Sequence, residues 1–141
     1  MPVTGKADLH QVALAALAGP TGEVLGPDAL AAAAARTYAD LVRVSAPLIG
    51  HAGVSALTGR AVHLAQREHP LLGRHGEPPG AERTFDDVMA CLKGQDPAAA
   101  TDAAAAVFTS FFGLLVDFIG EPLTASLLRK AWPHAVAYAS R

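Results

Sequence analysis

The most apolar stretch of the chain is AAAAVFTSFFGLLVDFIGEPLTASLLRKAWP, residues 103–133. On a helical wheel, residues 107–120 show a wide apolar face and one narrow strip of small or polar side chains. A helix that spans a bilayer needs about 20 apolar residues and has no reason to gather its polar ones on one side. We therefore expect a central core helix that packs against several neighbours, and no membrane span.

The narrow strip of this helix contains small residues at helical spacing. Ser110, Gly113, Asp117 and Gly120 recur every three or four residues and therefore stack along one side. Small side chains there would let a second helix approach closely. The simpler interpretation is the solvent-facing side of a core helix, and the sequence leaves both open.

Proline and glycine divide the rest of the chain into helices. Predicted helices cover residues 8–18, 28–44, 47–68, 85–93, 97–119 and 121–132. The last two begin with an acidic residue followed by proline, which is favoured in a first helical turn. Ser45 is expected to cap the helix that begins at Pro47. The remaining expectations are loops over 19–26 and 70–83, and frayed ends over 1–6 and 134–141.

The fold class follows from these elements. No window shows sustained period-two alternation between hairpin turns, so no sheet is expected. The prediction is an all-α, compact bundle of five or six helices, with the long helix of the C-terminal half at its centre. Residues 1–141 are expected to form a single domain, a length that can bury a core without disulfides.

The predicted helix over 47–68 contains interior glycines. Gly50, Gly53 and Gly59 each cost a helix about 1 kcal/mol relative to alanine. Because Gly50 and Gly53 fall on the apolar face, close contact with another helix is the expected compensation. A ligand lying against exposed backbone is the alternative.

The charge content bears on partners and compartment. Charged residues make up 17% of the chain, against about 25% in typical soluble domains, which suggests surface covered by another chain. The net charge is -2 and no basic run is present, so nucleic acid is not an expected partner. The lone cysteine, Cys91, cannot form an internal disulfide, and no continuous apolar signal segment opens the chain. We expect a cytoplasmic protein.

These features predict a non-enzymatic interaction or regulatory module that self-associates, most simply as a homodimer, with another regulatory protein as a further candidate partner. Trp132 is the expected anchor, because tryptophan is favoured at interaction hot spots. The candidate interface residues are Ser110, Gly113, Asp117, Leu123, Leu127 and Trp132.

The alternative function is a small-molecule sensor or carrier, including one for haem or a metal. His51, Thr58 and His69 share an angular position on one predicted helix, and with Phe111 they would line a pocket between helices 47–68 and 97–119. No HExxH, ExxH or CxxC motif is present, so the sequence assigns no catalytic residue, metal ligand or cofactor.

Two segments, ALTGRAVHLAQREHPLL (56–72) and FFGLLVDFIGEPLTASLLRKAWP (111–133), resemble segments of small uncharacterised all-helical proteins of GC-rich bacteria. The resemblance covers about a third of the chain and rests on hydrophobic pattern. It implies a bacterial, cytoplasmic helical module with a regulatory role, and it carries over no activity and no site residue.

Overall fold

The computed structural model describes residues 5–19, 27–72, 85–92 and 94–139. Within these ranges it contains helices, one 3-10 turn and no strand, which confirms the predicted all-α class. The elements are α1 (Lys6–Ala18), α2 (Pro27–Glu68), η1 (Pro70–Leu72), α3 (Phe85–Ala90), α4 (Pro97–Ile119), α5 (Glu121–Ala131) and α6 (Pro133–Ala139).

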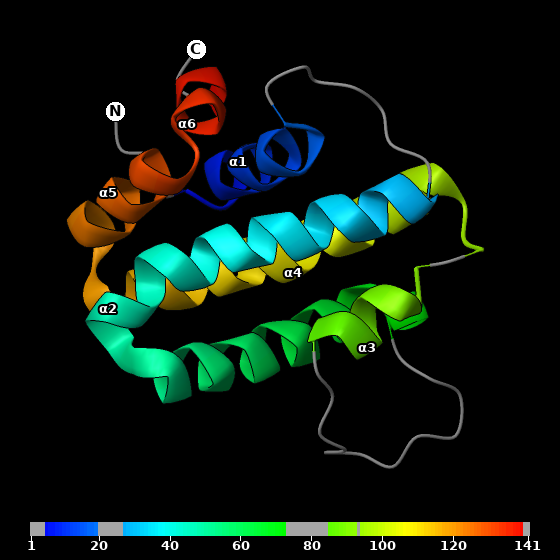
Figure 1. The fold of residues 1–141 in the computed structure, drawn as a ribbon, viewed down its shortest axis with the longest axis horizontal. Helices are drawn as coiled ribbons and strands as arrows, with labels where there is room; N and C mark the ends of the chain where they lie inside the picture. Colours follow the sequence, from blue (N-terminus) through cyan, green and yellow to red (C-terminus); the bar gives the residue numbers. More distant parts are fainter. Residues whose placement is uncertain (1–4, 20–26, 73–84, 93, 140–141) are drawn as a thin grey trace.

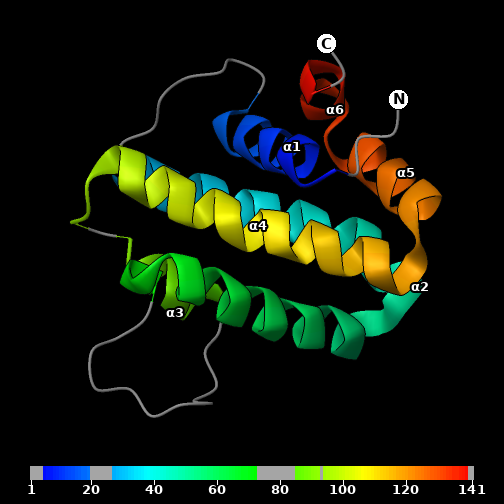
Figure 2. The ribbon, with the colours of Figure 1, turned by 180° about the vertical axis from the view of Figure 1, so that it is seen from behind.

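Helix α4 lies at the centre of the bundle and has the predicted ends. The Asp96 carboxylate accepts a hydrogen bond from the Ala99 amide at 3.1 Å and caps its start. Gly120, with φ 90°, ends it and leads directly into α5. Figures 1 and 2 show α4 flanked by both halves of α2, with α1 across it. The expected core helix with several neighbours is confirmed.

The apolar composition of α4 suits this central position. Among the described helices, α4 is long and apolar enough to cross a bilayer by length and composition alone, a test that core helices of globular proteins also pass. Its alanine-rich first half is buried from Ala103 to Ala106. Because alanine side chains are short, α1 and α2 can pack closely against this part of α4.

Helix α2 bends at Gly50, which corrects the predicted break near Ser45. The helix continues through Pro47, and the non-helical backbone angles fall at Gly50, with φ 77° and ψ 161°. Residues other than glycine rarely adopt these backbone angles. The Ser45 hydroxyl is buried without a hydrogen-bond partner, so it caps no helix. The bend turns the second half of α2 back alongside α4 (Figure 1).

The expected close helix contact at the glycines is also wrong. A Cβ added at Gly50 would meet no atom within 4 Å, and the one at Gly53 would lie 3.2 Å from Ile49 Cβ of the preceding turn. Gly50 therefore supplies backbone freedom, and Gly53 makes room for the turn before the bend. Neither glycine admits a neighbouring helix.

A row of aromatic rings crosses the core. Tyr38 stacks on Phe85 of α3 with ring centroids 4.3 Å apart, and Phe85 lies 5.6 Å from Phe108. Phe108 is followed by Phe112 at 6.4 Å and Trp132 at 5.5 Å beyond it. The row connects α3, α2 and α4 to the end of α5, so it ties distant parts of the chain into one core.

Most of the segment 134–141, for which fraying was expected, forms the short helix α6 (Pro133–Ala139). Pro133 stops α5 and also opens α6, because proline is favoured in a first helical turn. Ala135 and Val136 are buried, and α6 packs against α1 and α5 (Figure 1).

Helix α3 ends at Ala90, before the predicted 93. The loop expected over 70–83 begins with η1. The remainder of that loop, and residues 1–4, 20–26 and 140–141, lie outside the described residues.

Candidate functional site

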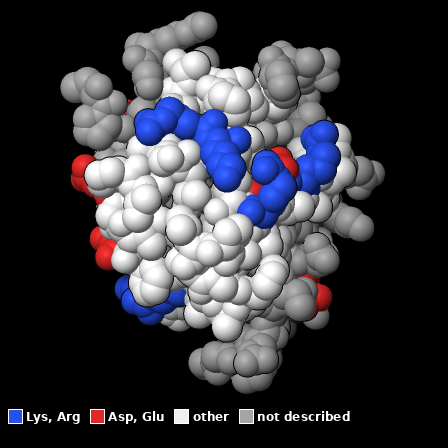
Figure 3. Space-filling model, turned by 60° about the vertical axis from the view of Figure 1, so that its left-hand side comes forward, with Lys and Arg blue, Asp and Glu red and all other residues white. Residues whose placement is uncertain are grey.

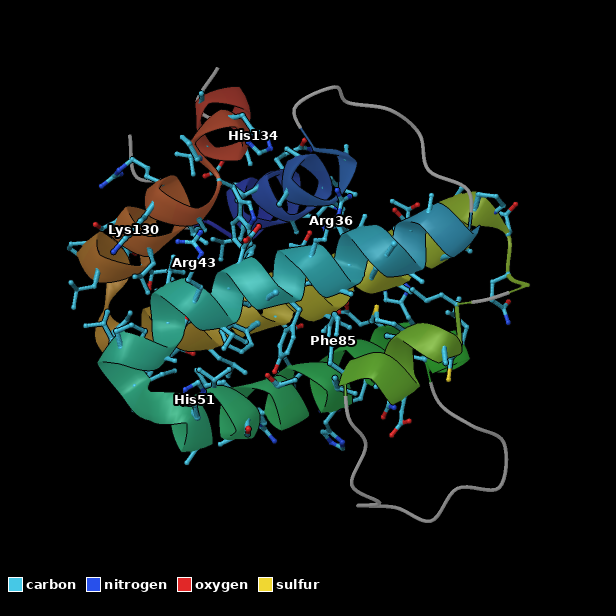
Figure 4. The ribbon with its side chains drawn as sticks, in the orientation of Figure 1. Arg36, Arg43, His51, Phe85, Lys130 and His134 are labelled. Carbon is cyan, nitrogen blue, oxygen red and sulfur yellow. The ribbon has the colours of Figure 1, made fainter. Side chains whose placement is uncertain are left out.

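The structure does not bring the four predicted ligand-binding residues together. His51 is exposed beside the bend of α2 (Figure 4), and Phe111 is buried in the core. Thr58 is only 7% exposed. Its hydroxyl forms hydrogen bonds within the protein, with the Tyr38 hydroxyl at 2.9 Å and with the Val54 carbonyl at 2.8 Å. Of the four, His69 lines the pocket described next.

That pocket is lined by residues of α1, of the end of α2 and of the middle of α4. Its volume is about 900 Å³. It lies between the two helices that the sequence predicted, but at the C-terminal end of α2 and with α1 as a third wall. The polar residues that line it are His10, Arg67, Glu68, His69, Thr109 and Ser110.

A hydrogen bond holds one histidine against the pocket wall. The Thr109 hydroxyl donates to the Ala105 carbonyl at 2.7 Å, so its oxygen is available to accept from His10 Nδ1 at 3.4 Å. This pairing leaves His10 Nε2 as an acceptor in the neutral ring and as a donor in the protonated ring. Sequence reasoning missed His10, because nothing local indicates that α1 crosses α4 at this point.

No metal site is apparent in the described part of the chain, where no group of three or more His, Cys, Asp and Glu side chains could hold an ion. The histidines at the pocket are therefore considered as hydrogen-bonding groups.

A second candidate site is a surface that we call the apolar end, defined by Leu48, Phe118 and Leu123. Their exposed fractions are 53%, 66% and 50%, the large hydrophobic side chains most open to solvent among the described residues. They belong to the bend of α2 and to the junction of α4 and α5, which meet at one end of the bundle (Figure 1). Figure 3 shows this end as a broad field of uncharged residues.

Charges of both signs lie at the margins of the apolar end. Asp117 and Glu121 are exposed beside Phe118 at the α4–α5 junction. On the other side, basic side chains follow the first half of α2 and the end of α5 (Figures 3 and 4). The exposed members are Arg36, Arg43, Arg129 and Lys130. Arg43 has an exposed ion pair with Asp40 at 3.9 Å, a kind of contact that contributes little to stability.

The predicted interface residues divide between surface and core. Asp117 and Leu123 are exposed, and Ser110 and Gly113 are half-buried with open space above Gly113. Leu127 and Trp132 are buried, and the Trp132 ring packs 5.5 Å from Phe112. Trp132 is thus a core residue of the protomer, which corrects its prediction as an interface anchor. The helical wheel assigned Phe118 to the core face. Nothing in the sequence indicated that this side chain would remain exposed.

Comparison with protein-family models, with curated proteins and with solved structures finds no match to this chain. The site geometry and the chemistry of its residues are therefore the basis for a functional proposal.

Proposed function

We propose that this protein is a non-enzymatic helical module that self-associates through the apolar end, most simply as a homodimer. The single observation that carries the proposal is the exposure of Leu48, Phe118 and Leu123 at one end of the bundle. Leaving large apolar side chains in water is unfavourable, and contiguous exposed apolar surface commonly marks a protein interface.

The charges at the margins favour a second copy of the same chain as the occupant. A two-fold interface uses the same patch on both partners and brings different margins of that patch face to face. In such a pairing the acidic margin at Asp117 and Glu121 can meet the basic margin at Arg129 and Lys130. The low charge content of the chain agrees with a surface that is covered in the assembly.

A regulatory role in a bacterial cytoplasm completes the proposal. The lone cysteine supports a reducing compartment, and the resemblance of two segments to small bacterial helical proteins supports the rest.

Sedimentation velocity over a concentration series from low to hundreds of micromolar tests self-association, and native mass spectrometry gives the stoichiometry. Phe118→Lys is expected to weaken the dimer about tenfold or more, because it places a charge within the apolar end at its most exposed side chain. Ala98→Lys is the matched control, since Ala98 is exposed at the opposite end of the same helix. A protein that stays monomeric at every concentration would overturn the proposal.

Charge reversal tests the pairing of margins. Glu121→Lys and Lys130→Glu are each expected to weaken association, and the double variant is expected to recover most of the loss. Equal losses that add in the double variant would contradict the proposed pairing of acidic with basic margins.

A further inference from the structure

The pocket lined by α1, α2 and α4 contains hydrogen-bond donors that have no partner among the described residues. Arg67 is exposed, and its guanidinium makes no ion pair or hydrogen bond within the described part of the chain. The same holds for the hydroxyl of Ser110. Glu68, the carboxylate in the pocket lining, already has an interaction partner. The Arg67 guanidinium and the Ser110 hydroxyl can therefore donate to a ligand, and these donors favour an acceptor such as an oxyanion.

The two histidines of the pocket are held in position by the fold. His10 is bonded through Nδ1 to Thr109. The backbone of His69 closes the end of α2, with its amide bonded to the Ala65 carbonyl at 2.8 Å and its carbonyl bonded by the Leu72 amide at 3.0 Å. Neither position depends on a ligand. The His10 ring can therefore act as a pre-placed polar contact, which lowers the entropic cost of binding.

The charge balance of the pocket selects a ligand with one negative charge. Arg67 is permanently cationic and is the lysine or arginine of the pocket lining, and Glu68 is its acidic residue. A single carboxylate matches the one guanidinium. A phosphate group with nearly two charges would lack a second permanent cation in the pocket lining.

The size and walls of the pocket indicate an organic molecule. A volume of about 900 Å³ is far larger than an inorganic ion needs and falls in the range of small-molecule sites, about 300–1,000 Å³. Leu64, Ala7 and Ala106 contribute apolar wall. A ligand bound in this pocket can place a short hydrocarbon part against these side chains.

We propose that this pocket binds a small organic monocarboxylate, with its carboxylate toward Arg67 and its hydrocarbon part against Leu64 and Ala106. This binding is separate from the self-association proposed above, because the pocket shares no residue with the apolar end.

Titration of the isotope-labelled full chain with benzoate and hexanoate, followed by NMR, tests the proposal. Chemical-shift changes are expected at His10, His69 and Ser110, with saturation. Benzamide, which has the same ring without the negative charge, is expected to leave these signals unchanged, and inorganic phosphate is expected to bind at least about tenfold more weakly than benzoate.

Arg67→Gln is expected to weaken benzoate binding about tenfold or more, since it removes the charged donor. Arg60→Gln is the matched control, because Arg60 is exposed on the same half of α2 and does not line the pocket. No shift of the pocket signals with either acid, equal binding of benzamide or phosphate, or an unchanged affinity in Arg67→Gln would each overturn the proposal. Phe118→Lys should bind benzoate normally and Arg67→Gln should self-associate normally, so the two proposals fail independently.

Discussion

The hydroxyl of Tyr38 lies 2.9 Å from the hydroxyl of Thr58 and joins the two halves of α2 across the bend at Gly50. Thr58 donates its own proton to the Val54 carbonyl at 2.8 Å, so Tyr38 is the donor between the hydroxyls. The Tyr38 ring also stacks on Phe85. One side chain therefore holds together the bend of α2 and the docking of α3.

We expect Tyr38→Phe to lower the free energy of unfolding by about 0.5–1.5 kcal/mol, the usual net contribution of one hydrogen bond. Urea denaturation of Tyr38→Phe, Thr58→Val and the double variant measures the coupling between the two side chains. The control cycle pairs Tyr38→Phe with Thr124→Val, whose hydroxyl bonds within its own helix to Gly120. Additive effects in the first cycle would show that the hydroxyl pair contributes nothing.

Replacement of the glycine at the bend should be costly, while a glycine in regular helix should be improvable. Gly50→Ala forces a side chain into φ 77° and ψ 161° and is expected to destabilise by about 1–3 kcal/mol. Gly59→Ala, at an exposed helical position with open space for a Cβ, is expected to stabilise by about 0.4–1 kcal/mol. Thermal and urea unfolding compare the two. Similar effects from both substitutions would contradict the bend at Gly50.

The same substitution should destabilise the protein strongly at one phenylalanine of α4 and very little at another. Phe112 is fully buried between Phe108 and Trp132, so Phe112→Ala is expected to cost about 3–5 kcal/mol. Phe118 is 66% exposed, and Phe118→Ala is expected to change the stability of the monomer by about 0.5 kcal/mol or less. Urea denaturation at a concentration below dimer formation separates these effects from association. A large loss in Phe118→Ala under those conditions would argue against its exposure.

The docking of α6 can be tested with a pair of alanines. Ala135 is fully buried and Ala137 is exposed on the same short helix. Ala135→Asp would bury an unpaired charge and is expected to cost about 3 kcal/mol or more. Ala137→Asp is expected to have an effect near zero. Hydrogen exchange of residues 133–139 adds a direct readout, and equal tolerance of both substitutions would show that the segment frays.

The sequence predicted the ends of α4 and α5 because those signals are local. The Asp96 carboxylate reaches an amide three residues away, and Gly120 ends a helix through its own backbone angles. The break in α2 was misplaced because Pro47 is a strong local signal, whereas the bend at Gly50 depends on packing of both halves against α4. The formation of α6 also depends on packing, since α6 lies against α1 and its Ala135 is buried.

The sequence by itself determined that the chain is helical, that its most apolar helix is central, and where that helix starts and stops, because propensity, periodicity and capping act over a few residues. Only the tertiary structure decided that Trp132 is covered while Phe118 is open, and that His10 and Arg67 border one pocket. The physical reason is that burial and proximity depend on which elements cover a given face, and a helical wheel contains no information about those neighbours.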